Sequence, residues 1–314
     1  MKEINVISWG GGTQSTALML MMLEENKPVD YIIFSDTGDE SEMTYAQVYK
    51  VQKYVEEKYG KEIIVVKKTK ESKTNDEIIE MVKGGNFTGK DYRSSNYADL
   101  YQNQVLFYQG VLDQADIVPH WVINQHGELG KLMGRQCTVT YKIMQIISEI
   151  RNREGLKRFN AKLHRINMYI GFTTDEISRV KPSPSSYIVN LFPLVDKKLT
   201  KFDCIDYVKK ELGFTPVSSV CNMCYANDFK RIYNLYLTDQ TSWNKLLVLD
   251  DAMANKPTPH KIRGDVYMFH WQAKMQKRLK DIDMDALHKE RNKYTQLNIF
   301  DMEEQMACMG GCFL

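Results

Sequence analysis

The sequence predicts an α/β fold with a doubly wound, mainly parallel sheet and a smaller helical C-terminal portion. Apolar runs at residues 4–7, 31–35 and 63–66 alternate with helical patterns at residues 17–23 and 43–59. This strand–helix–strand order is typical of parallel sheets with right-handed crossovers. The first two runs end in polar, glycine-bearing turns, as buried parallel strands do where their carboxyl ends open into a ligand crevice. With 314 residues, 43% of them apolar, the chain can bury one large core or two modest ones.

The rest of the chain continues this alternation and then becomes more helical. Residues 84–96 are polar and glycine-bearing, which predicts a surface loop. We expect one α/β domain over residues 1–200 and a helical region over residues 201–314 that carries a Cys-x-x-Cys motif and a cysteine-bearing tail. Further strands are predicted at residues 121–124, 168–172 and 187–192, and further helices at residues 76–83, 142–150, 201–212, 228–237 and 242–254.

Charge and hydropathy exclude several classes of protein. The chain has 42 Lys and Arg against 40 Asp and Glu, a net charge of +2, so bulk charge predicts neither tight nucleic-acid binding nor attraction to membranes. No apolar run approaches the roughly 20 residues of a membrane span, and the N-terminus enters a strand without a signal-peptide core. We therefore expect a cytoplasmic protein without a membrane partner, whose six cysteines do not form a disulfide framework.

Residues 8–16, Ser-Trp-Gly-Gly-Gly-Thr-Gln-Ser-Thr, form the most informative stretch, because they lie at a predicted strand-to-helix turn. Consecutive glycines let the backbone approach a ligand closely, and the following helix adds its positive dipole end and the hydroxyls of Thr13, Ser15 and Thr16. No lysine follows the glycines and no third fingerprint glycine is present, which excludes the common nucleotide-binding glycine motifs. The stretch predicts a phosphate site. The alternative is a turn that merely connects a strand to a helix.

Polar side chains also follow the second strand and the strand predicted at residues 168–172. Asp36 suits Mg²⁺ or a ribose, because a hard cation prefers carboxylate oxygens. Arg179 offers a fork of donors to a phosphoryl group and Lys142 a point charge. Surface ion pairs are the alternative for these two cations, and a helix cap of Thr173, Asp175 and Glu176 is the alternative for the acidic turn before Arg179.

The cysteines leave several kinds of site open. Cys221 and Cys224 form a Cys-x-x-Cys, which suits half of a zinc site, a redox pair, half of a cluster or two buried thiols. Cys137 with His126 or His270 would complete a zinc site. A cubane on Cys137, Cys221 and Cys224 would leave one iron open to bind sulfur. Cys204, within a predicted helix, is expected in the core.

Cys308 and Cys312 lie in a terminal segment, with two glycines between them. Such a segment can bring a thiol pair to an active site as sulfur carrier or reductant, or supply a missing metal ligand. An incidental pair of cysteines in a chain end is the alternative.

Basic and aromatic residues interleave over residues 261–280. This pattern is compatible with a nucleic-acid track. We favour an amphipathic helix with a solvated charged face.

The order of these motifs resembles one protein superfamily. The glycine stretch resembles the Ser-Gly-Gly-x-x-Ser/Thr loop of the PP-loop ATP pyrophosphatases, which are adenine nucleotide alpha hydrolase-like proteins. Together with residues 34–38, 135–138, 171–179 and the later cysteines, it resembles the phosphoadenosine-phosphosulfate (PAPS) reductase-like branch, often encoded by phages and mobile elements. The resemblance implies a Rossmann-like, HUP-type fold and an enzyme that binds ATP with Mg²⁺, cleaves it between the α and β phosphates and adenylylates a substrate.

The branch is also similar to sulfur-transferring PP-loop enzymes, several of which hold an iron–sulfur cluster on three cysteines. The leading hypothesis is therefore adenylylation for thiolation of a nucleic acid, tRNA or DNA, or of a small molecule, with a [4Fe-4S] cluster or reactive thiols and a sulfur-donor protein. One alternative is a PAPS or APS reductase-like oxidoreductase, although residues 307–312 replace the C-terminal Glu-Cys-Gly of true reductases. The other is a non-catalytic nucleotide-binding protein with structural zinc.

The resemblance assigns roles residue by residue. A homodimer in the cytoplasm of a bacterial or phage-infected cell is the expected setting. The predicted catalytic residues are Asp36, Cys137, Lys142, Arg179, Cys308 and Cys312, and the predicted metal ligands are Cys137, Cys221 and Cys224. The predicted nucleotide contacts are Ser8, Gly10, Gly11, Gly12, Thr13, Gln14, Ser15, Thr16, Asp36, Thr37, Gly171, Thr173 and Glu176.

Overall fold

The computed structural model describes residues 1–69, 71–84, 97–115, 118–131, 136–258 and 260–294. The chain divides into two compact units that interleave in sequence. Unit 1 comprises residues 1–36, 42–67 and 142–219, and unit 2 comprises residues 37–41, 68–141 and 220–314. The predicted domains over residues 1–200 and 201–314 stay a prediction. No helix in the described part of the chain is long and apolar enough to cross a membrane.

Unit 1 is built on a five-stranded parallel sheet, which confirms the predicted fold class. The strand order is β3-β2-β1-β6-β7, and every neighbouring pair is parallel. The chain winds outward from β1 through β3 and then crosses to β6 on the other side of β1, so the order of winding reverses between β1 and β6. Ligands of such sheets bind at the carboxyl ends of the strands at this switch point. The strands are β1 (Lys2–Trp9), β2 (Tyr31–Asp36), β3 (Ile63–Lys67), β6 (His164–Ile170) and β7 (Ile188–Leu191).

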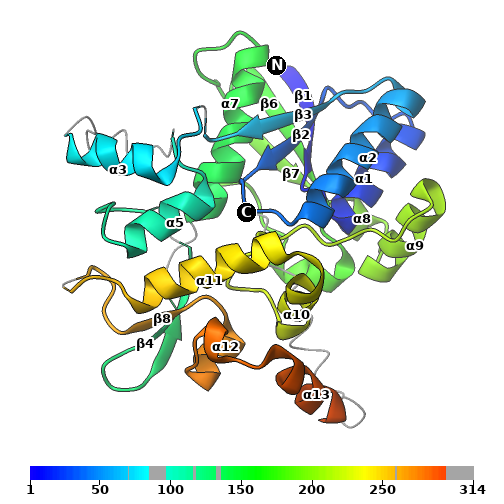
Figure 1. Cartoon of the computed structure of the whole chain (residues 1–314). Coiled ribbons are helices and arrows are strands. Elements are labelled where there is room, and N and C mark those ends of the chain that lie inside the picture. Colours follow the sequence, from blue (N-terminus) through cyan, green and yellow to red (C-terminus); the bar gives the residue numbers. More distant parts are fainter. Residues whose placement is uncertain (70, 85–96, 116–117, 132–135, 259, 295–314) are drawn as a thin grey trace. The chain divides into compact units, whose positions relative to one another are not determined.

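Helices cover both faces of this sheet. Figure 1 shows α1 and α2 on one side of it and α7 on the other. Ile7 and Phe34 pack with the apolar side chains of α1 and α2. Ile4 and Val6, which alternate with Ile7 along β1 and so face the opposite side of the sheet, are also buried. Strand β1 is therefore buried on both faces. This explains why β1 and β2 appear in the sequence as continuous apolar runs. The helices of unit 1 are α1 (Thr13–Glu24), α2 (Glu42–Tyr59), α7 (Met144–Arg153), the 3₁₀-helical η2 (Thr174–Arg179), α8 (Pro193–Asp196) and α9 (Lys201–Leu212).

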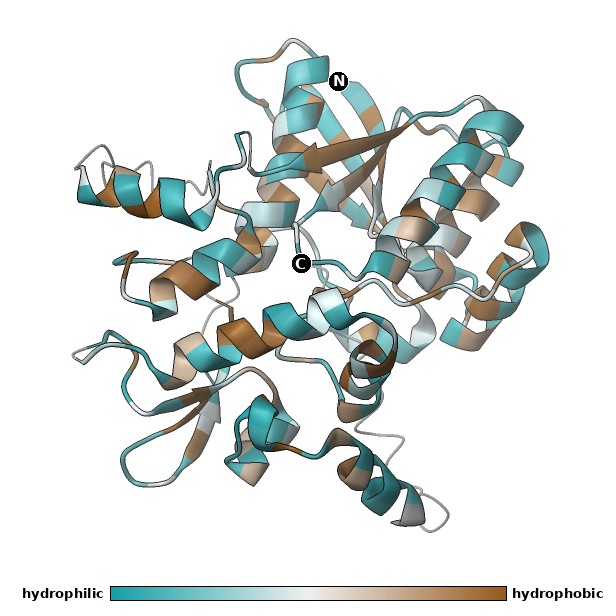
Figure 2. Cartoon of the chain, in the orientation of Figure 1, coloured by the Kyte–Doolittle hydropathy of each residue, from teal (hydrophilic) through white to brown (hydrophobic). Residues whose placement is uncertain are grey.

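Unit 2 is mainly helical and has a small antiparallel sheet in the order β5-β4-β8. Figure 2 shows hydrophobic residues on α5 and α11, whereas α13 is largely hydrophilic. The π-helical η1 spans the passage from unit 2 to unit 1. The elements are α3 (Asn75–Lys83), α5 (Leu100–Tyr108), β4 (Trp121–Ile123), β5 (Leu129–Lys131), α6 (Gln136–Thr138), η1 (Val139–Ile143), α10 (Phe229–Thr238), α11 (Gln240–Ala254), β8 (Asp265–Tyr267), α12 (His270–Met275), η3 (Leu279–Asp281) and α13 (Met284–Tyr294).

Residues 261–280 do not form the amphipathic helix that we favoured, and that interpretation is wrong. They form strand β8, the short helix α12 and the 3₁₀ turn η3. The rings of Tyr267, Phe269 and Trp271 are buried in unit 2. They are therefore core residues, and these three rings are not available to the nucleic-acid track with which the pattern is compatible. The predicted loop at residues 84–96 lies, apart from Gly84, outside the described residues.

Candidate functional site

The glycine stretch forms a tight turn between β1 and α1. Gly11 has a φ of +73°, and a Cβ there would lie 3.1 Å from the ring of Phe34. A Cβ on Gly12 would lie 3.1 Å from the backbone N of Ser219. Glycine is thus required for backbone conformation at one position and for close packing at the next. The loop reaches the N-terminus of α1, where unpaired N–H groups and the helix dipole favour an anion.

The hydroxyls at the start of α1 brace this loop. Ser15 Oγ accepts a hydrogen bond from Gly10 N at 3.1 Å and donates to Gly12 O at 3.2 Å. Thr16 Oγ1 donates to Gly12 O at 2.7 Å and accepts from the indole of Trp9 at 3.0 Å. Both hydroxyls are used to hold the loop backbone, so the backbone N–H groups are its main resource for phosphate. Trp9 is a supporting residue that the sequence analysis missed.

Gly171 brings the end of β6 against the start of α1. A Cβ at this position would lie 2.7 Å from both the N and the Cα of Ser15. Neither atom can move without moving the loop or the helix. The structure therefore brings together the glycine loop and Gly171 at the β1/β6 switch point, as the sequence predicted for one sheet edge. Ser8 lies earlier, inside β1, paired with β2 and β6.

A buried polar group lies beside the loop. Gln14 Nε2 donates to Glu176 Oε2 at 3.2 Å, and Glu176 Oε1 is paired with Arg179. The Arg179 guanidinium lies 4.2 Å from the ring centre of Phe172. Burial raises the pKa of Glu176, and Arg179 opposes this shift. Arg179 is thus held by a buried carboxylate and an aromatic face, which differs from the surface ion pair we considered.

The proposed cap at η2 is only partly present. Thr173 occupies the N-cap position but makes no side-chain capping bond. Asp175 instead accepts a hydrogen bond from the backbone N of Lys201 at 2.6 Å. Lys142 is buried on η1.

Asp36 ends β2 and is held from two sides. Tyr45 of α2 donates to Asp36 Oδ1 at 2.8 Å, and Lys67 Nζ lies 2.7 Å from Asp36 Oδ2. Lys67 is the last residue of β3 and is paired in register with Asp36. The sequence analysis missed both partners. The register of two neighbouring parallel strands would have placed Lys67 beside Asp36, because both residues end their strands.

The Cys-x-x-Cys forms a buried turn in unit 2. Cys221 Sγ lies 3.2 Å from Thr37 Oγ1 and donates to Glu40 Oε1 at 3.8 Å. The N–H of Cys224 donates to the carbonyl of Cys221 at 3.0 Å. Both cysteines are buried. The hydroxyl of Thr37, which was predicted to contact the nucleotide, therefore contacts the thiol of Cys221 in this structure.

Asp39 ties the turn of residues 37–41 to the cysteine turn. Its carbonyl accepts from Asn222 N at 2.8 Å, and its Oδ2 accepts from Met223 N at 3.0 Å. Burial raises the pKa of Asp39 to about 8, and the carboxylates of Asp99 and Glu40 add to the shift. Neither Asp39 nor Glu40 had been singled out from the sequence, because their burial against the later turn is a long-range contact.

The three predicted metal ligands do not form a metal site in the described structure. Cys137 is half-buried on α6 and packs against the core of unit 2. Among the described residues, no group of three or more His, Cys, Asp and Glu side chains is placed to hold a metal ion. Because this donor set does not fit a three-cysteine cluster, we derive no step through one. Arg135, Cys308 and Cys312 lie outside the described residues.

Cys204 is fully buried in the core of unit 1, as expected. Burial raises the pKa of its thiol to about 12, so it stays protonated and unreactive.

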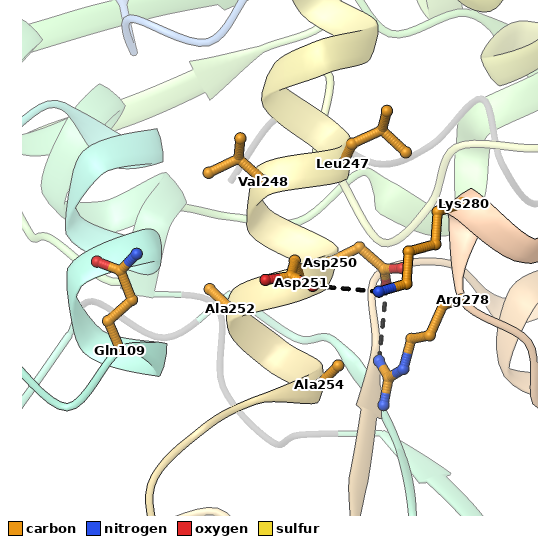
Figure 3. A pocket seen from close by; sticks show the side chains of 9 residues that line it. All are labelled: Gln109, Leu247, Val248, Asp250, Asp251, Ala252, Ala254, Arg278 and Lys280. Atoms are coloured by element: carbon orange, nitrogen blue, oxygen red, sulfur yellow. Dashed lines mark hydrogen bonds and ion pairs between the residues drawn. The ribbon is translucent and has the colours of Figure 1, made fainter.

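A separate cavity of about 380 Å³ in unit 2 contains none of the predicted site residues (Figure 3). At its base, Asp250 Oδ1 accepts from Gln272 Nε2 and Asp250 Oδ2 accepts from Leu279 N, both at 2.7 Å. Arg278 lies 3.6 Å from the same carboxylate. The cavity is lined by Gln109, Leu247, Val248, Asp250, Asp251, Ala252, Ala254, Arg278 and Lys280.

Burial raises the pKa of Asp250, so folding favours its protonated form and its contribution to stability is lost as pH rises through the folded-state pKa. Asn at position 250 cannot titrate. The free energy of unfolding of the wild type should therefore fall relative to that of Asp250→Asn as pH rises. The difference should change by up to about 1.4 kcal/mol per unit of pKa shift. Urea unfolding between pH 4 and 8 measures the difference. A difference that is the same at every pH would contradict this.

Comparisons with known proteins found one matching family model and similar solved structures. Residues 4–104, about a third of the chain, match a family model described as the phosphoadenosine phosphosulfate reductase domain. Among solved structures, the chain is similar to the U34-tRNA thiolase NcsA from Methanococcus maripaludis with its [4Fe-4S] cluster. The identity is 13% over 85% of this chain and 77% of that one, with a TM-score of 0.36. No curated protein matches.

The parallel sheet with helices on both faces defines a Rossmann-like α/β fold, with the glycine loop at its switch point. Residues 4–104 are similar to the phosphoadenosine phosphosulfate reductase domain family, as the order of motifs in the sequence predicts. The association with phages stays a prediction.

Proposed function

We propose that this protein is an ATP-dependent enzyme that adenylylates an acceptor and then transfers sulfur to it. The observation that carries the proposal is the glycine loop braced by Ser15 and Thr16 and packed against Gly171 at the β1/β6 switch point. The match of residues 4–104 to the phosphoadenosine phosphosulfate reductase domain supports the sulfur chemistry of the proposal.

The proposed first step is attack of an acceptor oxygen on the α-phosphorus of ATP. The bond between the α-phosphorus and the bridging oxygen breaks, and pyrophosphate leaves. Backbone N–H groups of the loop would stabilise the negative charge that builds on the pyrophosphate. Asp36 would hold Mg²⁺ beside it, because carboxylate and phosphate oxygens are the ligands that Mg²⁺ prefers.

In the proposed second step, the outer sulfur of a persulfide on Cys221 attacks the acceptor carbon that bears the adenylate, a carbon–sulfur bond forms, and the carbon–oxygen bond to AMP breaks. The acceptor is then joined to Cys221 by a disulfide, and attack of the Cys224 thiolate on the Cys221 sulfur releases the thiolated acceptor and leaves a Cys221–Cys224 disulfide. Cys221 is the described candidate, since its thiol is buried with the Thr37 hydroxyl and the Glu40 carboxylate around it. The Glu40 carboxylate accepts the hydrogen bond of this thiol and so fixes the position of the sulfur. A dithiol reductant would reduce the Cys221–Cys224 disulfide, and a sulfur-donor protein would then transfer the outer sulfur of its own persulfide to Cys221.

Incubation with Mg²⁺, ATP and fractionated tRNA, DNA or small-molecule acceptors tests the proposal. We expect pyrophosphate and AMP to be released in equal amounts, at a rate that depends on the acceptor fraction. Release of ADP and phosphate would contradict cleavage between the α and β phosphates. Bound ATP without pyrophosphate release from any fraction would count against adenylylation.

The domain match also favours a second candidate, reduction of a sulfonucleotide by thiols. This reaction releases sulfite from PAPS or APS and requires no ATP. A sulfite assay with either compound and a dithiol reductant therefore separates the two candidates.

A further inference from the structure

The ion pair between Asp36 and Lys67 joins two very different environments. The Asp36 side chain is 3% exposed, whereas that of Lys67 is 58% exposed. Asp36 is also fixed by Tyr45, but among the described residues Lys67 has Asp36 as its only ion-pair partner. The carboxylate is thus rigidly held, while the lysine head group can leave it by rotation of a flexible stem that is already in solvent.

A buried carboxylate that stays ionised is stabilised by a paired cation. Lys67 supplies this charge in the protein without ligand. If Mg²⁺ arrives with ATP and binds Asp36, the cation supplies it instead, and the ammonium group of Lys67 is released at the same sheet edge. The loop itself provides no lysine for a polyphosphate that carries about four negative charges when fully ionised.

Arg179, another cation predicted for the phosphate site, is less available. Arg179 is paired with the buried Glu176 and stacked on Phe172. Moving it would leave the Glu176 carboxylate buried without its partner, which is costly. Lys67 carries no such penalty once Mg²⁺ has replaced it at Asp36.

We propose that Lys67 is a phosphate-binding residue of the ATP site, which exchanges its partner from Asp36 to the polyphosphate when the magnesium complex binds. This inference rests on the proposed ATP site and adds to it the lysine that the glycine loop lacks. It also gives Asp36 two successive cation partners at the same oxygen atoms.

Binding measurements by calorimetry with Lys67→Met, Lys67→Arg and Lys53→Met test the proposal. Lys53 is the matched control, because it is an exposed lysine paired with Glu57 on α2. We expect Lys67→Met to weaken Mg-ATP binding at least tenfold, Lys67→Arg to restore it to within about threefold, and Lys53→Met to leave it unchanged. Binding of adenosine, which has no phosphate, should be the same for all four proteins.

A purely structural ion pair predicts a different result. Lys67→Met would then weaken adenosine and Mg-ATP binding equally, or neither, and either outcome would overturn the proposal. Pyrophosphate release, measured on the same samples, keeps the two proposals apart. Selective loss of Mg-ATP binding without any turnover in the wild type would retain the role of Lys67 and reject the enzymatic function. Normal turnover of the wild type, with unchanged Mg-ATP binding in Lys67→Met, would retain the enzymatic function and reject the role of Lys67.

Discussion

Alanine at position 171 is expected to weaken ATP binding at least tenfold and to destabilise unit 1 by about 1–3 kcal/mol. The new Cβ would lie 2.7 Å from the N and Cα of Ser15, a distance that real Cβ atoms do not adopt. Because both contacts are backbone atoms, the strain must be relieved by shifting the start of α1 or the end of β6. Either shift displaces the Ser15 hydroxyl, which braces the loop through Gly10 and Gly12.

Gly130→Ala is the matched control for this substitution. The nearest atom to a Cβ at Gly130 is the carbonyl oxygen of Val122 at 4.0 Å, which is ordinary van der Waals contact. ATP affinity from calorimetry and the melting temperature should change for Gly171→Ala and remain near wild type for Gly130→Ala. Equal ATP affinities in the two variants would show that the contact between Gly171 and Ser15 has no part in shaping the nucleotide site.

The elements of the sheet were predictable because their signals are local. β2 appears in the sequence as a continuous apolar run, and α2 shows Val48, Val51 and Val55 at helical spacing on its buried face. Both were predicted to within one residue of their observed bounds. The glycine loop was predictable for the same reason, since a run of three glycines between an apolar run and a helical pattern is visible without any tertiary information.

The elements of unit 2 were harder to predict because their burial depends on distant residues. α5 was missed, since its buried face includes the amides Asn103 and Gln104. Its N-terminus nevertheless carries a capping box of Asp99 and Gln102 that a closer analysis of the sequence would have found. β8 pairs with β4, more than 130 residues earlier in the chain. Such long-range pairing overrides local helical patterns.

In the candidate site, too, the features with local sequence signals were predicted and those that depend on long-range contacts were missed. The backbone cradle was predicted, but Tyr45 and Lys67 were not, because side-chain partners depend on strand order and register. The Cys-x-x-Cys was recognised, whereas the residues around its thiols come from a turn some 180 positions earlier in the chain. Sequence motifs therefore identify the groups that do chemistry better than the groups that tune them.

Serine at position 221 is expected to lower sulfur transfer at least a hundredfold while ATP binding changes by less than about twofold. Serine keeps the size of the side chain and can still pair with Thr37 and Glu40, which lie 3.2 and 3.8 Å from the sulfur. Its hydroxyl does not ionise near neutral pH and cannot carry a transferable sulfur atom.

Cys204→Ala supplies the control, because this thiol lies in the core of unit 1 and its pKa is raised to about 12. We expect it to lose about 1 kcal/mol of stability and to retain sulfur transfer. Thiolated product is measured by mass spectrometry, together with iron and acid-labile sulfide in anaerobically purified protein. Loss of iron in Cys221→Ser but not in Cys204→Ala would make Cys221 a cluster ligand. Loss of product without any iron in the wild type would make it the sulfur carrier, and full activity in Cys221→Ser would exclude both roles.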